Sequence, residues 1–390
     1  MIALKLAYRN LVGAGLRTFL NVFVLSLSFV IIIWYNGMMN GWDRQARRDT
    51  INQQIGGGQY WHEKYDPYDP FTLIDAHGVP PEKIQSGINK GIFTPILISQ
   101  ATIYPDGRIQ SILLKGIDPS QEILDLPTEY LKTDIEEIPA ILGSRMAENS
   151  KLKVGDFVTV RWRDVNGTFD AAEAKIVHIF KTNVPAVDMG QMWIPIENLR
   201  KMLQMPGEAT IVVTAKDANI SGDISNWSFR DHGFLLTDIE DMIRMKKVGA
   251  SIMWIILLLL AWLAIFDTQV LSIFRRQKEI GTDIALGMTR GQVIRLFTVE
   301  GAMHGILAAI LAAIYGIPLL YLQTVKGYPL PKGTEDFGIA ISDVIYPYYS
   351  IGLILTTTIL ILIATTIVSF LPTRRITKMK PTDAIRGKIQ

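Results

Sequence analysis

The chain contains no cysteine among its 390 residues. This absence excludes disulfide bonds, cysteine-ligated zinc, a thiol nucleophile and a lipid-modified N-terminal cysteine. Histidine is also scarce, and the spacing of the few that occur is not typical of metal ligands. We therefore expect no metal site and interpret each histidine as structural. The five are His62, His77, His178, His232 and His304.

Motifs for catalysis or nucleotide binding are lacking as well. The sequence has no Gly-x-x-x-x-Gly-Lys-Ser/Thr motif, so we do not expect this chain to bind ATP phosphates itself. Ser144 lies between Gly143 and Arg145 rather than in the Gly-x-Ser-x-Gly turn of a nucleophilic serine. The formal net charge is only +2, which argues against nucleic acid as a partner. The chain is thus predicted not to be an enzyme and to bind no cofactor directly.

Apolar residues, in contrast, are abundant. They make up 49% of the sequence, and the mean hydropathy is +0.23. Some apolar runs are long enough to cross a hydrocarbon core of about 30 Å. The predicted spans are residues 18–39, 248–274, 300–322 and 348–371. The sequence therefore predicts an α-helical membrane protein with four transmembrane helices and a large mixed α/β extracytoplasmic domain inserted between helices 1 and 2.

Lysine and arginine gather at the predicted membrane surface in residues 1–17, 275–299 and 372–390. Cytoplasmic loops carry an excess of these residues, so all three segments are predicted to be cytoplasmic. The first has apolar residues at helical spacing, which predicts an interfacial helix. The last has six basic residues against one acid, Asp383, and is also compatible with a tail that binds anionic membrane lipids.

The polar insertion, residues 40–247, has no run long enough to span a membrane and reads as a folded outer domain. A Pro-Asp-Gly turn at Pro105 joins two of its expected strands. A shorter outer loop is expected over residues 323–347. Strands are expected at 93–99, 101–104, 109–115, 157–163, 174–180, 191–194 and 210–214, and helices at 80–85, 144–150 and 196–203.

A further helix is expected to run from residue 237 through the second span to residue 274, with a capping box formed by Thr237 and Glu240. Asp267 lies inside this span, where a carboxylate is energetically costly. It stands about 12 Å along the helix from Arg275. Two interpretations remain open: a mechanistic role, or a polar contact with a partner helix.

The segment between the second and third spans is predicted to form a helical hairpin. A short helix is expected over Glu279–Leu286, followed by Gly287 in a left-handed conformation. Thr289 then caps the next helix, and Gln292 completes a capping box. The closely spaced glycine and capping box indicate a well-defined turn, which favours a surface that another protein contacts and moves.

This segment also resembles a known family. Its residues match, in order and spacing, the coupling segment of FtsX-like permeases, the membrane subunits of type VII or mechanotransmission ABC transporters. The family includes MacB and the lipoprotein-releasing LolC and LolE subunits, and the layout of the chain is closest to the latter two. The matching residues are Lys278-Glu279-Ile280-Gly281, Ala285-Leu286-Gly287-Met288-Thr289 and Glu300-Gly301, together with Ile141 to Asp156 in the outer domain and Leu371 to Arg386 in the tail.

The resemblance implies several partners. A separate dimer of ATPase subunits would bind ATP and Mg, and a second permease subunit, identical or paralogous, would pair with this one. Ile280 and Leu286 are expected to be apolar anchors in a groove of the ATPase. The family tends to have asparagine near Asp267, so that residue is a departure. The residues that the resemblance assigns to coupling are Glu279, Ile280, Gly281, Ala285, Leu286 and Gly287.

The resemblance also implies a place and a function. The chain is expected in the bacterial inner membrane, in contact with its lipids and with a periplasmic domain. The favoured function is release of lipoproteins, which implies a lipoprotein substrate and a periplasmic carrier. Three alternatives stay open: an efflux or export permease of MacB type, an FtsX-like regulator of a cell-wall hydrolase, and a membrane enzyme or sensor without an ATPase. MacB itself carries its nucleotide-binding domain in the same chain.

Overall fold

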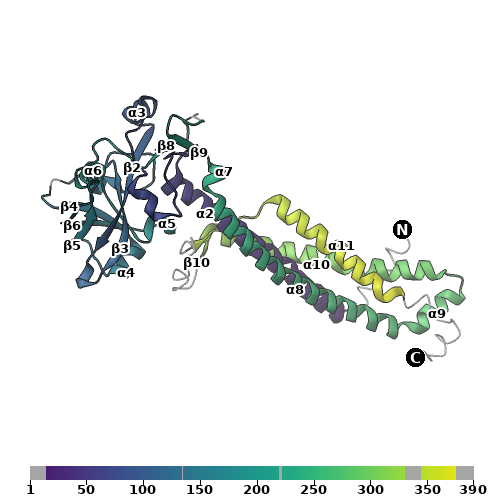
Figure 1. The fold of residues 1–390 in the computed structure, drawn as a ribbon. Coiled ribbons are helices and arrows are strands. Elements are labelled where there is room, and N and C mark those ends of the chain that lie inside the picture. The colour runs from purple at the N-terminus through teal and green to yellow at the C-terminus, as the bar shows by residue number, and fades with distance from the viewer. Residues whose placement is uncertain (1–14, 134, 219–221, 330–343, 375–390) are drawn as a thin grey trace. The chain divides into compact units, whose positions relative to one another are not determined.

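A computed structural model describes residues 15–133, 135–218, 222–329 and 344–374 of the chain. The predictions for residues 1–14 and 375–390 lie outside this described part. The chain divides into two compact units, each of which is considered by itself (Figure 1). We call them the helical unit, which in the described part of the chain comprises residues 15–43, 243–329 and 344–374, and the sheet unit, which comprises the described residues of Arg44–Met242.

Long helices dominate the helical unit. Within the described part of the chain, three helical stretches have the length and composition to cross a membrane: Thr18–Ile55, Arg290–Lys326 and Ile351–Thr373. The span predicted at 248–274 falls in α8, and the count of four spans remains a prediction. The elements are α2 (Leu16–Thr50), α8 (Thr237–Arg275), α9 (Gln277–Ala285), α10 (Arg290–Lys326), α11 (Ile351–Thr373) and the small hairpin β10 (Tyr328–Pro329) and β11 (Val344–Ile345).

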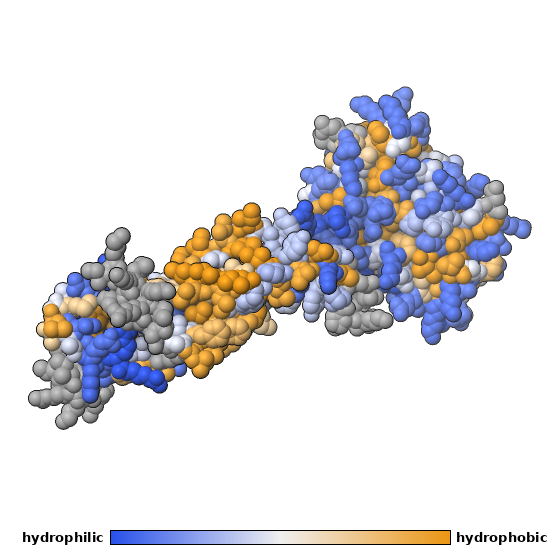
Figure 2. Space-filling model, turned by 180° about the vertical axis from the view of Figure 1, so that it is seen from behind, coloured by the Kyte–Doolittle hydropathy of each residue, from blue (hydrophilic) through white to orange (hydrophobic). Residues whose placement is uncertain are grey.

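Small residues let these helices pack closely. A Cβ added to Gly301 of α10 would come within 2.2 Å of the Ser369 hydroxyl on α11. One added to Gly316 would come within 2.7 Å of Val30 on α2. Glycine at these positions therefore brings α10 against both neighbours. The outward-facing side chains of the same helices are apolar, which Figure 2 shows as orange surface.

A nine-stranded sheet forms the sheet unit, in the order β3-β7-β4-β6-β5-β2-β8-β1-β9. An additional pairing of β2 with β3 closes six of these strands into a ring, with β8, β1 and β9 extending from β2. The pairs β3–β7 and β4–β6 are parallel. The strands are β1 (Gln59–His62), β2 (Phe93–Ile103), β3 (Gln110–Ile117), β4 (Ile138–Gly143), β5 (Phe157–Arg163), β6 (Phe169–Phe180), β7 (Gln191–Pro195), β8 (Ile211–Thr214) and β9 (Trp227–Arg230).

Three apolar clusters among the described residues stabilise this sheet. Side chains alternate between the faces of a strand, so the neighbours Leu97 and Ile98 belong to different clusters. Leu199 of α6 covers the first cluster. The other elements of the unit are the helices α3 (Glu82–Asn89), α4 (Ser144–Ser150), α5 (Pro185–Asp188), α6 (Ile196–Leu203) and α7 (His232–Leu235), the π-helix η1 (Ile51–Ile55), and the 3-10 turns η2 (Pro70–Ile74), η3 (Pro105–Gly107) and η4 (Thr128–Leu131).

The capping box predicted at the start of α8 is not formed. The Thr237 hydroxyl instead donates to the Gly233 carbonyl, 3.0 Å away. The Glu240 carboxylate pairs with Arg47 of α2. The reason is that α7 leads almost directly into α8, so the first amides of α8 already have backbone partners, such as Leu236 O for the amide of Glu240.

Candidate coupling site

The predicted hairpin between the second and third spans is present in the helical unit. Helix α8 ends at Arg275, α9 covers Gln277–Ala285, and α10 begins at Arg290. With nine residues, α9 is shorter than the roughly 12 residues that an isolated helix needs in water. Its neighbours must therefore hold it in place.

One means of holding α9 is an apolar cluster beneath it. Ile280 is only 1% exposed and packs with Ile273 of α8 and with Val293 and Phe297 of α10. Burial of a side chain of this size contributes about 1.5–3 kcal/mol. Ile280 thus fixes α9 to its own hairpin, which corrects the prediction that it would dock into a partner's groove. Gly281 beside it is buried as well.

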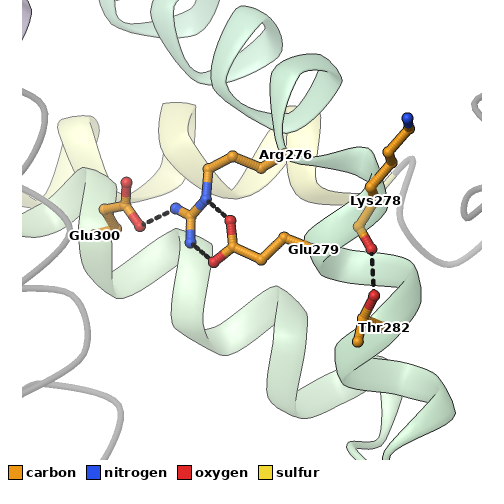
Figure 3. A network of polar contacts seen from close by, with 5 residues as sticks. All are labelled: Arg276, Lys278, Glu279, Thr282 and Glu300. Atoms are coloured by element: carbon orange, nitrogen blue, oxygen red, sulfur yellow. Dashed lines mark hydrogen bonds and ion pairs between the residues drawn. The ribbon is translucent and has the colours of Figure 1, made fainter.

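The second means is a charge network centred on Arg276 (Figure 3). Its Nε and Nη2 donate to the two carboxylate oxygens of Glu279, at 2.6 and 2.7 Å. Its Nη1 donates to Glu300 of α10 at 2.9 Å. The guanidinium also lies over the Phe297 ring, 4.7 Å from the centroid. This forked arrangement is the strong form of an arginine–carboxylate pair, and it joins α9 to α10.

The network changes the ionisation of its members. Hydrogen bonding from Arg276 lowers the pKa of Glu279, although partial burial opposes that shift. The pKa of Arg276 is raised, chiefly by its hydrogen bonds to Glu279. Burial raises the pKa of the nearby Asp283 carboxyl, and the Glu279 charge adds to that effect. The Arg276–Glu279 pair therefore remains charged at neutral pH.

The turn after α9 follows the predicted chemistry. Gly287 has φ +107°, in the region that favours glycine. Thr289 Oγ1 accepts from the Gln292 amide at 3.3 Å, and Gln292 Oε1 accepts from the Thr289 amide at 2.8 Å. The capping box is therefore confirmed. Just before the turn, Leu286 is 81% exposed.

The structure thus separates the predicted coupling residues into two groups. Ile280 and Gly281 are buried, and Glu279 is held by Arg276. The tip of the hairpin is exposed, and we call Ala285, Leu286 and Gly287 the exposed tip. Sequence reasoning missed Arg276 as the centre of the network. Arg276 could have been recognised from its position three residues before Glu279, because side chains at this spacing contact each other on a helix.

Asp267 lies apart from this network. Its side chain on α8 is exposed, and it has no hydrogen-bond or ion-pair partner among the residues that the structure describes. Gln269, two residues further on, is buried instead. An exposed carboxylate on a predicted membrane helix is consistent with a contact to another subunit, and its role stays a prediction.

Comparison with known proteins agrees with this picture. Residues 251–381 match the family described as FtsX-like permease C-terminal. The chain is 23% identical over 397 residues to the lipoprotein-releasing system transmembrane protein LolC of Xylella fastidiosa, covering 93% of this chain and 92% of that one. It is 20% identical over 414 residues to LolC of Neisseria meningitidis, covering 95% and 94%.

A solved structure was also found to be similar, the extracellular domain of the noncanonic ABC-type transporter YknZ from Gram-positive bacteria. It is 15% identical, covers 42% of this chain and 84% of that one, and has a TM-score of 0.25.

The hairpin lies within the region that matches the FtsX-like permease family, and the apolar helices fit a membrane subunit of that kind. Among such permeases the chain resembles LolC over nearly its whole length. These similarities indicate the membrane subunit of a transporter.

Proposed function

We propose that this permease belongs to an ATP-driven complex that releases lipoproteins from the bacterial inner membrane to a periplasmic carrier. The observation that carries the proposal is the similarity to LolC, which extends over 93% of the chain and includes the sheet unit. In this proposal a separate ATPase dimer binds ATP and Mg, and a second permease subunit, identical or paralogous, completes the membrane part.

The geometry of the hairpin supports a way to couple the two parts. The exposed tip offers an apolar contact, Leu286, to a groove of the ATPase. Force on the tip would pass into α9, which Ile280 and Arg276 hold against α8 and α10. Helix α8 continues without a break from Arg275 back to Thr237. A displacement at the hairpin would therefore move a stiff element that leads to the sheet unit.

The test is substitution at the exposed tip. Leu286→Asp should leave membrane insertion intact but abolish co-purification of the ATPase and lipoprotein release, because a charge replaces an apolar contact. Leu286→Met is the matched control and should retain both, since it keeps an apolar side chain of similar volume. The purified permease alone is expected to hydrolyse no ATP.

Normal release by Leu286→Asp would refute the coupling role of the tip. The cargo is tested separately, by depleting the permease from cells. Retention of lipoproteins in the inner membrane supports the proposal. Unchanged lipoprotein sorting would contradict the proposal. Loss of drug efflux would then favour an efflux permease, and loss of cell-wall hydrolysis would favour a regulator of a cell-wall hydrolase.

A further inference from the structure

An apolar groove lies between α8 and α11 of the helical unit, with a cavity volume of about 790 Å³. Trp254, Leu259 and Trp262 line it from α8, and Ile359 and Ile363 line it from α11. Of the described residues that line it, only Thr356 carries a hydroxyl, and none is charged. Along α11 the groove extends from Thr356 to Leu371, which is about 22 Å at the rise of an α-helix.

A polar pocket of about 380 Å³ adjoins one end of this groove. The two share Trp254, Thr356 and Leu360, so they lie side by side. The polar end is lined by Asn36 and Asn40 of α2 and by Lys247 and Ser251 of α8. Lys247 Nζ lies 2.8 Å from Asp43 Oδ2, so a phosphate at this end would share the ammonium with that carboxylate.

The polarity of the site matches an amphiphile. A long apolar groove inside a predicted membrane region suits an acyl chain. The amide, hydroxyl and ammonium groups at its end suit a phosphate or an ester carbonyl. The groove is longer than half of a hydrocarbon core of about 30 Å, so it accommodates an acyl chain of a lipid from one leaflet. The predicted topology puts the polar end on the side of residues 40–247, which is the outer leaflet.

The volume of the groove falls within the range of about 300–1,000 Å³ that is typical of small-molecule sites. We infer that the α8–α11 groove binds one acyl chain of an outer-leaflet glycerophospholipid, with its phosphate at Lys247.

Native mass spectrometry of the full-length chain tests this inference. The protein is reconstituted with phosphatidylethanolamine and phosphatidylglycerol, extracted into mild detergent, and examined for retained lipid. The unmodified chain should retain a phospholipid. Ile363→Trp, which fills the groove from an exposed position, should reduce retention several-fold. Lys247→Gln should also reduce it, because the phosphate loses its cation.

The matched control is Ile314→Trp. Ile314 is 68% exposed on α10 and does not line the groove, so retention should not change. Equal retention in Ile363→Trp and the unmodified chain would overturn the inference, as would recovery of a lipoprotein in place of phospholipid. Disulfide crosslinking of two chains through Ile363→Cys would overturn it too, because a second copy would then cover the groove. These readouts do not depend on transport.

Discussion

Arg276 links two elements of the hairpin through one side chain. One guanidinium reaches carboxylates from α9 and α10, and Glu300 is only 9% exposed in its side chain. Lysine could not reproduce this contact, because its ammonium is a point charge without the planar fork. The Arg276–Glu300 link joins residues 24 positions apart, so no local sequence pattern reveals it.

Replacement of Arg276 by methionine should weaken the hairpin. Glu300 would lose a cation in a largely buried place, and hydrogen bonds to charged groups contribute about 1.5–3 kcal/mol each. We expect a lower melting temperature of the detergent-solubilised chain and faster proteolysis within residues 275–290. Arg275→Met is the control, since Arg275 is exposed and should have little effect. Equal destabilisation by both changes would contradict the central role of the Arg276 network.

Among the elements, the turn between α9 and α10 gives the sharpest structural requirement. Gly287 has open space around the place of a Cβ, so its constraint comes from the backbone conformation and not from crowding. A β-branched residue resists positive φ, and strain of this kind costs about 1–3 kcal/mol.

We therefore expect Gly287→Val to disturb the direction in which α10 leaves the hairpin and to reduce ATPase co-purification. Gly291→Val is a close control: Gly291 also has open space, but it lies in α10 without a positive φ. It should leave co-purification near normal. Identical behaviour of the two variants would mean that the conformation of Gly287 does not matter for coupling.

Elements defined by local patterns could be predicted from the sequence. Strand β5 and helices α4 and α6 begin and end as expected, and the residues of β5 alternate between exposed and buried. The capping box at Thr289 needs only residues three apart, and it is present.

Elements that depend on distant partners could not be predicted. Strand β4 was missed because Pro139 argues against a central strand; the structure tolerates it because β4 pairs with β7 only at Ile141. Strands β1 and β9 show no clear alternation in the sequence, and β1 pairs with both β8 and β9. Strand β2 is one strand where two were predicted, since it continues through Gln100.

For the molecule as a whole, the membrane topology is the prediction that concerns the largest part of the chain. The absence of cysteine makes site-directed labelling unambiguous. Lys153 in the sheet unit and Lys278 in α9 are both exposed. With a membrane-impermeant maleimide on spheroplasts, Lys153→Cys should react at once and Lys278→Cys only after permeabilisation, because of the distribution of basic residues. The reverse labelling pattern would contradict the prediction that the hairpin is cytoplasmic.

The closed ring of strands in the sheet unit has a consequence for aggregation. Unpaired strand edges act as templates for aggregation, and closure removes them. In the described part of the sheet, closure leaves β9 as the terminal strand, and it has only four residues. Its Phe229 amide is already occupied by the Asp223 carboxylate at 2.8 Å. A partly folded neighbour therefore finds little backbone on which to add a strand. This limits aggregation at the predicted extracytoplasmic location of the sheet unit, where ATP-dependent chaperones are absent.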